Sequence, residues 1–292
     1  MKLWERLSGI ILRLFSLPDI QTFKESNPEI ALKRSLKLLD PPALDSIREF
    51  VKSNHTKSGG FADKAGKPDL YYTLFGYYLT EALELAELFP SVRKYVEQEI
   101  IQGNIKGVHL HCAAILSVRL GITAFPPGYF RKKIRKSLST QTKQQPAYSY
   151  FLNLLSSWYL HDYWGIFLTG RKLKKMNENS SLPAPVTAAL LVLQKSFNRP
   201  VSELEKNLMS YYSVPGGFKA TKTVPVPDLL STAVALYALG FARYDLRIIK
   251  PDCLNYIDSL FLEGGFGSNP LDPDPDIEYT FYGLLALGSL TK

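Results

Sequence analysis

Metal binding is the first chemistry that the side chains of this sequence raise. The 292 residues include only 2 Cys and 4 His. His109 and Cys112 are three residues apart, a spacing that puts two side chains on one face of a helix, and His161 with Asp162 forms a second pair. Zinc takes three or four protein ligands. We therefore expect a packed cysteine and ordinary histidines, and we predict neither zinc nor another cofactor.

Three aspartates near the C-terminus raise the question of magnesium. Asp272, Asp274 and Asp276 alternate with proline, which holds the chain extended. Loops of this kind are commonly polar connectors. Mg²⁺ binding by these carboxylates is one interpretation, but we favour a polar connecting loop.

Basic residues gather in two clusters, at positions 131–136 and 171–175. The chain has 35 Lys and Arg against 27 Asp and Glu, a net charge of +8. Such runs are typical of a solvated face, or of a surface that contacts anionic lipid or a protein partner. No nucleic-acid-binding motif accompanies the charge, so we predict no nucleic-acid partner.

The chain repeats a pattern of Gly-Gly-Phe, a short loop, Pro-Asp, a threonine and an apolar helix. Full copies occupy residues 59–79, 216–239 and 264–287, and a partial copy occupies 183–193. Thr187, Thr232 and Thr280 are spaced by 45 and 48 residues. Thr73 precedes Thr187 by 114 residues, which leaves room for two degenerate copies, near 111–116 and 148–152. Six units over residues 59–292 are therefore expected.

Each unit predicts a pair of helices. The Gly-Gly step turns the chain, and the Asp caps the helix that follows. That helix is apolar nearly all round, which is typical of a buried inner helix, whereas stretches such as 91–101 are amphipathic and indicate outer helices. The sequence thus predicts an all-α fold of inner and outer helix pairs, stacked as an open solenoid or closed into a ring.

Residues 1–58 precede the repeats and form an N-terminal helical extension that we expect to pack on the body as part of one structural domain. Apolar residues at helical spacing over positions 3–15 predict an amphipathic helix that packs on the body, lies on a membrane surface or docks a partner. No segment is long and apolar enough to span a membrane, and no secretion signal is present. We therefore expect a cytoplasmic protein, with peripheral membrane contact as an alternative.

The repeat resembles that of protein prenyltransferase β subunits and of squalene and terpenoid cyclases, over about four-fifths of the chain when counted in repeats. The resemblance implies an α/α toroid, a closed ring of about six inner and outer helix pairs. It also implies that an isoprenoid chain binds in an aromatic-lined central cavity. We expect Tyr72, Tyr279 and Tyr282 to line that cavity, and aromatic residues near 158–164 suit it as well. Aromatic faces hold apolar chains and stabilise carbocations.

The zinc site that the resemblance implies is broken. Protein prenyltransferases hold zinc with an Asp-x-Cys pair and a later His. Here the Asp falls on Asp228, but the Cys position is Leu230 and the His position is Tyr279. We therefore expect Asp228 to act as a helix cap, as the parallel Asp69 and Asp276 indicate.

The cyclase branch implies a different chemistry, in which an Asp-x-Asp-Asp-Thr motif protonates an alkene or an epoxide. In the sequence 276–280 this places Glu278 at the middle acid position. Tyr71 and Leu230 stand there in the other two full repeats. Such an acid needs a raised pKa. Glu278 is the candidate catalytic acid, set against the simpler interpretation of a solvated residue at a helix N-terminus.

Prenyltransferases also bind diphosphate with basic residues at the mouth of the ring. The corresponding loop here offers Lys219 and Lys222, which become the candidate diphosphate-binding residues. The sequence thus predicts prenyl transfer or terpenoid cyclisation without zinc. The alternative is a non-catalytic toroid that binds a lipid or scaffolds a protein partner.

Overall fold

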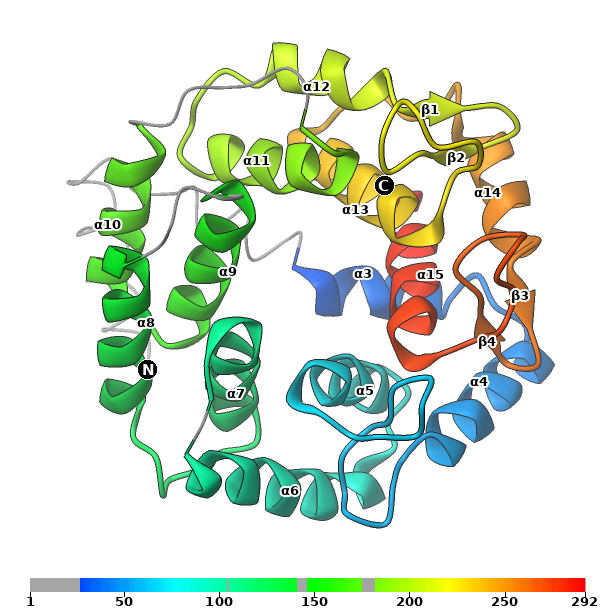
Figure 1. Ribbon diagram of the computed structural model, residues 1–292. Coiled ribbons are helices and arrows are strands. Elements are labelled where there is room, and N and C mark those ends of the chain that lie inside the picture. Colours follow the sequence, from blue (N-terminus) through cyan, green and yellow to red (C-terminus); the bar gives the residue numbers. More distant parts are fainter. Residues whose placement is uncertain (1–26, 104, 141–145, 175–181, 292) are drawn as a thin grey trace.

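The fold is all-α, as the sequence predicts. The computed structural model describes residues 27–103, 105–140, 146–174 and 182–291 (Figure 1). The helix expected over residues 3–15 lies outside these ranges, as does Lys175. Within them, the strands are two-residue antiparallel pairs beside the Gly-Gly turns: β1 (Tyr212–Ser213) with β2 (Gly217–Phe218), and β3 (Phe261–Leu262) with β4 (Gly265–Phe266). No helix in the described part of the chain is long and apolar enough to cross a membrane.

Six apolar helices form the centre of the molecule, at the positions of the six sequence units. Each packs on the next one along the chain, and the last packs back on the first. They are α5 (Leu70–Ala82), α7 (Gly107–Arg119), α9 (Pro146–Tyr159), α11 (Ala184–Ser196), α13 (Leu229–Ala242) and α15 (Ile277–Ser289). We call them the inner helices.

The amphipathic segments form helices on the outside of this group (Figure 1). Each packs its apolar face against one or two inner helices. They are α4 (Pro41–Ser53), α6 (Phe89–Gln102), α8 (Pro127–Thr140), α10 (Tyr163–Leu173), α12 (Ser202–Met209) and α14 (Lys250–Asp258), with the short 3₁₀ helix η1 (Ala86–Leu88) before α6. We call these six α-helices, without η1, the outer helices.

The threonine of the repeat ties each Gly-Gly-Phe turn to the inner helix that follows it. The backbone N–H of the motif's phenylalanine donates to the threonine hydroxyl at 2.9–3.2 Å in all three full copies. All three threonines, Thr73, Thr232 and Thr280, are fully buried. A buried N–H without a partner is costly, so this bond explains why the motif keeps a hydroxyl at that position.

The glycines of the turn are required by close contacts. Gly216 has a φ of +144°, and a Cβ there would lie 2.0 Å from the carbonyl oxygen of Asp252 in α14. Gly264 has a φ of +83° and meets Ser46 of α4 in the same way. Each turn thus packs directly on the backbone of an outer helix.

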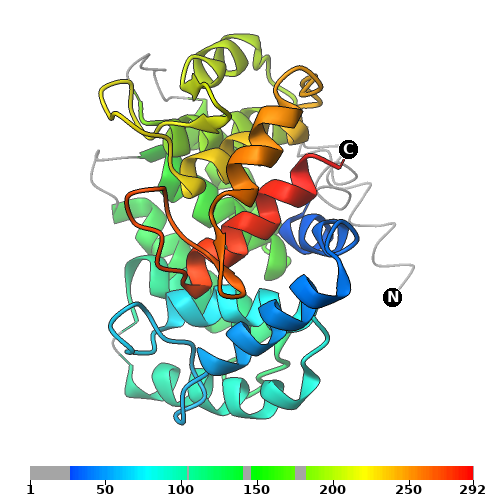
Figure 2. The ribbon, with the colours of Figure 1, turned by 90° about the vertical axis from the view of Figure 1, so that its right-hand side faces the viewer.

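Helix α3 (Pro28–Ser35) lies across the C-terminal ends of α5 and α15, opposite the Gly-Gly-Phe turns (Figure 2). Its backbone approaches α15 closely, since a Cβ at Gly288 would lie 1.9 Å from the carbonyl oxygen of Ala31. The N-terminal ends of α5, α13 and α15 are thus bordered by Gly-Gly-Phe turns, and the C-terminal ends of α5 and α15 by α3.

Candidate functional site

The candidate site lies at the N-terminal ends of the inner helices, where the first and last repeats meet. Tyr71 lies in the first turn of α5, and Glu278 lies in the first turn of α15. The Tyr71 hydroxyl donates to Glu278 Oε1 at 2.6 Å, although 207 residues separate them. The two residues occupy the same position of the repeat, and contact between α5 and α15 brings them together.

The surroundings of Glu278 raise its pKa. Burial is the largest cause, because a charged carboxylate loses water there. The negative charges of Asp276 and Asp69 act in the same direction, whereas the interactions with Tyr71 and Tyr72 act in the opposite direction. Glu278 therefore keeps its proton to a higher pH than an ordinary glutamate, as a general acid requires.

Aromatic rings pack around this carboxyl group. Tyr71 contacts Tyr72 and Phe75 in edge-to-face geometry, with ring centroids 5.8 and 4.8 Å apart. The aromatic contacts continue to α15, where the ring centroids of Phe75 and Tyr282 are 5.5 Å apart. Burial raises the phenol pKa of Tyr71 and Tyr282, so both hydroxyls stay neutral donors. Two of the expected lining residues, Tyr72 and Tyr282, thus belong to the same aromatic cluster beside Glu278.

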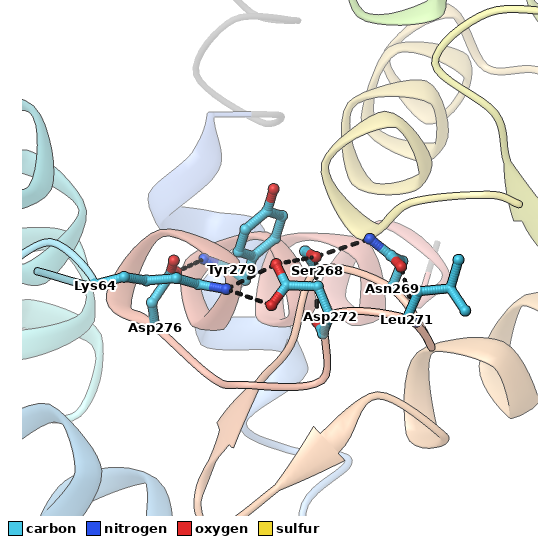
Figure 3. A network of polar contacts seen from close by, with 7 residues as sticks. All are labelled: Lys64, Ser268, Asn269, Leu271, Asp272, Asp276 and Tyr279. Carbon is cyan, nitrogen blue, oxygen red and sulfur yellow. Dashed lines mark hydrogen bonds and ion pairs between the residues drawn. The ribbon is translucent and has the colours of Figure 1, made fainter. Parts of the chain in front are cut away.

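Tyr279, the third expected lining residue, lies at the edge of the site beneath a lysine. The Nζ of Lys64 lies 5.7 Å from the centroid of its ring. Lys64 also donates to both carboxylate oxygens of Asp272, at 2.8 and 2.9 Å (Figure 3). This contact joins the loops of the first and last repeats.

The three C-terminal aspartates have separate structural roles. Asp272 pairs with Lys64 and accepts from the Ser268 hydroxyl at 2.8 Å (Figure 3). Asp276 caps α15 by accepting from the Tyr279 N–H at 2.7 Å, and Asp274 is exposed. Throughout the described ranges, no group of three or more His, Cys, Asp or Glu side chains is placed to hold a metal ion.

The other side chains that could bind a metal also have partners within the protein or are buried. His109 Nε2 lies 3.7 Å from Asp69, and the buried His111 contacts the Ser156 hydroxyl at 2.9 Å. Burial lowers the pKa of His111 to about 4 and raises the thiol pKa of Cys112, so both are neutral near pH 7. Asp162 caps α10 and pairs with Arg135 of α8.

Asp228 is a helix cap. Its Oδ1 accepts from the Ser231 N–H at 2.7 Å at the start of α13, as Asp69 and Asp276 do in their own repeats. The side chains that follow it in the zinc pattern, Leu230 and Tyr279, have no metal-binding atoms of the expected kind.

The two candidate diphosphate-binding lysines both contact Tyr211. The ammonium group of Lys222 lies over the ring of Tyr211, 5.5 Å from its centroid. Lys219 is half-buried directly after β2, and its backbone N–H donates to Tyr211. Trp164, from the expected aromatic group at 158–164, is 56% exposed on outer helix α10 and is not an inner residue.

Sequence reasoning missed the partner of Glu278 and a second group of charges. Tyr71 was visible as the residue of the first repeat that aligns with Glu278, but its role depends on contact between the first and last repeats. At the opposite end of the inner helices, Arg119 pairs with Glu81 and with Glu29. No spacing pattern links these three positions.

The chain matches no protein-family model, and no curated protein is significantly similar to it.

Proposed function

We propose that this protein is an α/α toroid of the prenyltransferase and terpenoid-cyclase type, and that it binds an isoprenoid or a similar long apolar molecule. Two observations support the ring: each inner helix packs on the next, and α15 packs on α5. The three Gly-Gly-Phe turns and their threonine bonds are the repeated motif on which the resemblance rests.

The reaction that the site supports best is proton-initiated cyclisation, with Glu278 as the acid. The observation that carries this proposal is a carboxyl group with a raised pKa. It accepts a hydrogen bond from Tyr71 and lies beside a cluster of aromatic rings. The Glu278 proton would move to one carbon of an alkene, leaving a cation on the substrate and a carboxylate that accepts from Tyr71. Aromatic faces stabilise the cation, and loss of a proton from it completes the reaction.

Prenyl transfer from a diphosphate is less well supported. Departure of diphosphate needs cationic groups beside the reacting centre. In the described part of the chain, the candidate Lys219 and Lys222 form no ion pair with Glu278, and Lys222 lies over Tyr211 instead. The replacement of the zinc ligands by Leu230 and Tyr279 also favours a non-catalytic alternative, in which the ring binds a lipid or scaffolds a partner.

Incubation of the full chain with squalene, farnesyl diphosphate and geranylgeranyl diphosphate, with and without Mg²⁺, tests the proposal by product analysis. We expect cyclised product from an unmodified polyene, without a need for Mg²⁺. The variant Glu278→Gln should lower turnover by about 100-fold or more while it still binds the substrate. The matched control Glu203→Gln, on the exposed surface of α12, should leave turnover unchanged.

Each outcome decides between the candidates. Binding without turnover would support the non-catalytic alternative. Turnover only with diphosphates and Mg²⁺ would support prenyl transfer. Undiminished product from Glu278→Gln would remove Glu278 as the acid, and absence of both binding and product with all three probes would overturn the isoprenoid proposal.

A further inference from the structure

The outer helices α8 and α10 lie next to each other and carry much of the positive charge of the molecule. α8 has five basic residues and α10 has two, and neither helix has an acidic residue. The whole chain has a net charge of +8. The two helices are in contact with each other and lie on the outside of the inner helices (Figure 1).

Three of these basic side chains fix the two helices in place. Arg131 donates to the carbonyl oxygen of Leu160, and Arg135 pairs with Asp162 at the start of α10. Lys172 of α10 donates to the carbonyl oxygen of Leu138 in α8. These contacts hold the helices in one arrangement, so the charges that remain outside form a fixed surface.

Other basic side chains on or beside these two helices share the surface with one exposed aromatic ring and two half-buried ones. We call this surface the basic face, and it consists of Lys132, Lys133, Lys136, Arg171 and Lys174 together with Tyr129, Trp164 and Phe167. Trp164 is 56% exposed and stacks on Phe167, with centroids 5.2 Å apart. Arg171 lies over Phe167 at 6.0 Å, and Lys133 lies over Tyr129 at 4.5 Å.

We infer that the basic face docks on an anionic lipid bilayer. Lysine and arginine are attracted to acidic headgroups, and each one near the surface strengthens binding. Tryptophan is the residue that prefers the boundary between headgroups and hydrocarbon. Since Trp164 and Arg171 are two helical turns apart on α10, the ring and the cation project from the same side. This combination fits a lipid surface better than a purely ionic partner, which has no hydrocarbon layer to receive an exposed indole.

The inference does not depend on the proposed reaction. It concerns the outer surface alone, and it holds equally for a cyclase and for a non-catalytic toroid. Its test therefore uses vesicle binding rather than turnover.

Co-sedimentation of the full chain with vesicles tests the basic face. We expect binding to phosphatidylcholine vesicles that contain phosphatidylserine, weak binding to pure phosphatidylcholine, and release at high salt. The variant Lys132→Glu/Lys174→Glu should lower the partition coefficient by at least about tenfold. The matched control Lys57→Glu/Lys94→Glu changes the net charge equally on other exposed positions and should bind much more strongly than that variant.

A second measurement tests the insertion of the ring. Lipids that carry a bromine quencher in the acyl chain should quench the fluorescence of the wild type more than that of Trp164→Phe. Equal binding by the two double variants, equal binding to neutral vesicles, or the same quenching in Trp164→Phe would overturn the inference. So would binding to double-stranded DNA or polyglutamate as tight as binding to the acidic vesicles at the same salt.

Discussion

The two ends of the inner helices use half-buried carboxyl groups in different ways. At the C-terminal end, Arg119 of α7 pairs with Glu81 of α5 and lies 3.5 Å from Glu29 of α3. Glu29 also accepts from the Tyr159 hydroxyl at 2.8 Å. At the N-terminal end, Glu278 accepts from a tyrosine and forms no ion pair with a described residue.

This difference indicates which carboxyl group is available for proton transfer. Burial raises the pKa of both Glu29 and Glu278, but the positive charge of Arg119 opposes this at Glu29. The net shift of the Glu29 pKa is upward as well, but its ion pair with Arg119 ties three helices together. A carboxyl group with only tyrosine partners exchanges its proton at lower cost. The C-terminal end is therefore structural, and the N-terminal end is the candidate site.

The strongest test of this comparison is Arg119→Met. We expect it to lower the free energy of unfolding by about 2 kcal/mol, because two half-buried carboxylates lose their cation. Urea denaturation measures the effect. The control Arg93→Met breaks the exposed Arg93–Glu97 pair on α6 and should cost less than about 0.5 kcal/mol. Equal small effects from both substitutions would show that the Arg119 group does not hold α3 on the inner helices.

Buried hydrogen bonds hold the turns at the N-terminal end, and Thr280→Val tests one of them. The substitution keeps the shape of the side chain but leaves the buried N–H of Phe266 without its acceptor. We expect the free energy of unfolding, measured by urea denaturation, to fall by about 2 kcal/mol. Thr187→Val is the matched control, because Thr187 bonds a carbonyl oxygen four residues earlier and holds no Gly-Gly-Phe turn. A smaller loss at Thr280 than at Thr187 would contradict the role assigned to the repeat threonine.

The sequence predicts the inner helices well because their signals are local. A capping Asp, a buried threonine and an apolar run are all contained within one repeat, and the structure gives α5, α13 and α15 at those positions. The Asp228 cap is confirmed for the same reason.

The features that sequence reasoning missed depend on contacts between distant segments. Tyr71 meets Glu278 only because α5 packs on α15, and Glu29 meets Arg119 only because α3 crosses the helix ends. The position of Lys222 follows from the course of a loop that lies against Tyr211. None of these contacts has a spacing that a single sequence displays.

The pH dependence of Glu278→Gln tests the acid at the N-terminal end. A raised folded-state pKa means that the folded protein binds more protons than the unfolded chain above pH 4.5, the ordinary glutamate value. The contribution of Glu278 to wild-type stability therefore falls as pH rises from 4.5 through the folded pKa. Glutamine has no such titration and still accepts from Tyr71.

We therefore expect the stability of Glu278→Gln relative to wild type to increase over this window and to level off above it. The increase is about 1.4 kcal/mol for each unit of pKa difference. Thermal unfolding at a series of pH values measures it. A constant difference between the two proteins would show that Glu278 has an ordinary pKa, and a decrease with rising pH would show that the carboxylate is stabilised by the fold.

The smallest effect is expected at the edge of the site, where Lys64 and Asp272 join the first and last repeats (Figure 3). Both side chains are well exposed, so solvent weakens their attraction, and we expect a coupling of about 0.5 kcal/mol. A double-mutant cycle with Lys64→Met and Asp272→Asn measures this coupling apart from the bond between Asp272 and Ser268. Lys64 lowers the pKa of Asp272, so the coupling should be lost as pH falls below 3.8, and high salt should also remove it. A coupling well above 1 kcal/mol that resists salt would show that this end, too, is held together by charge, and the contrast between the two ends would then fail.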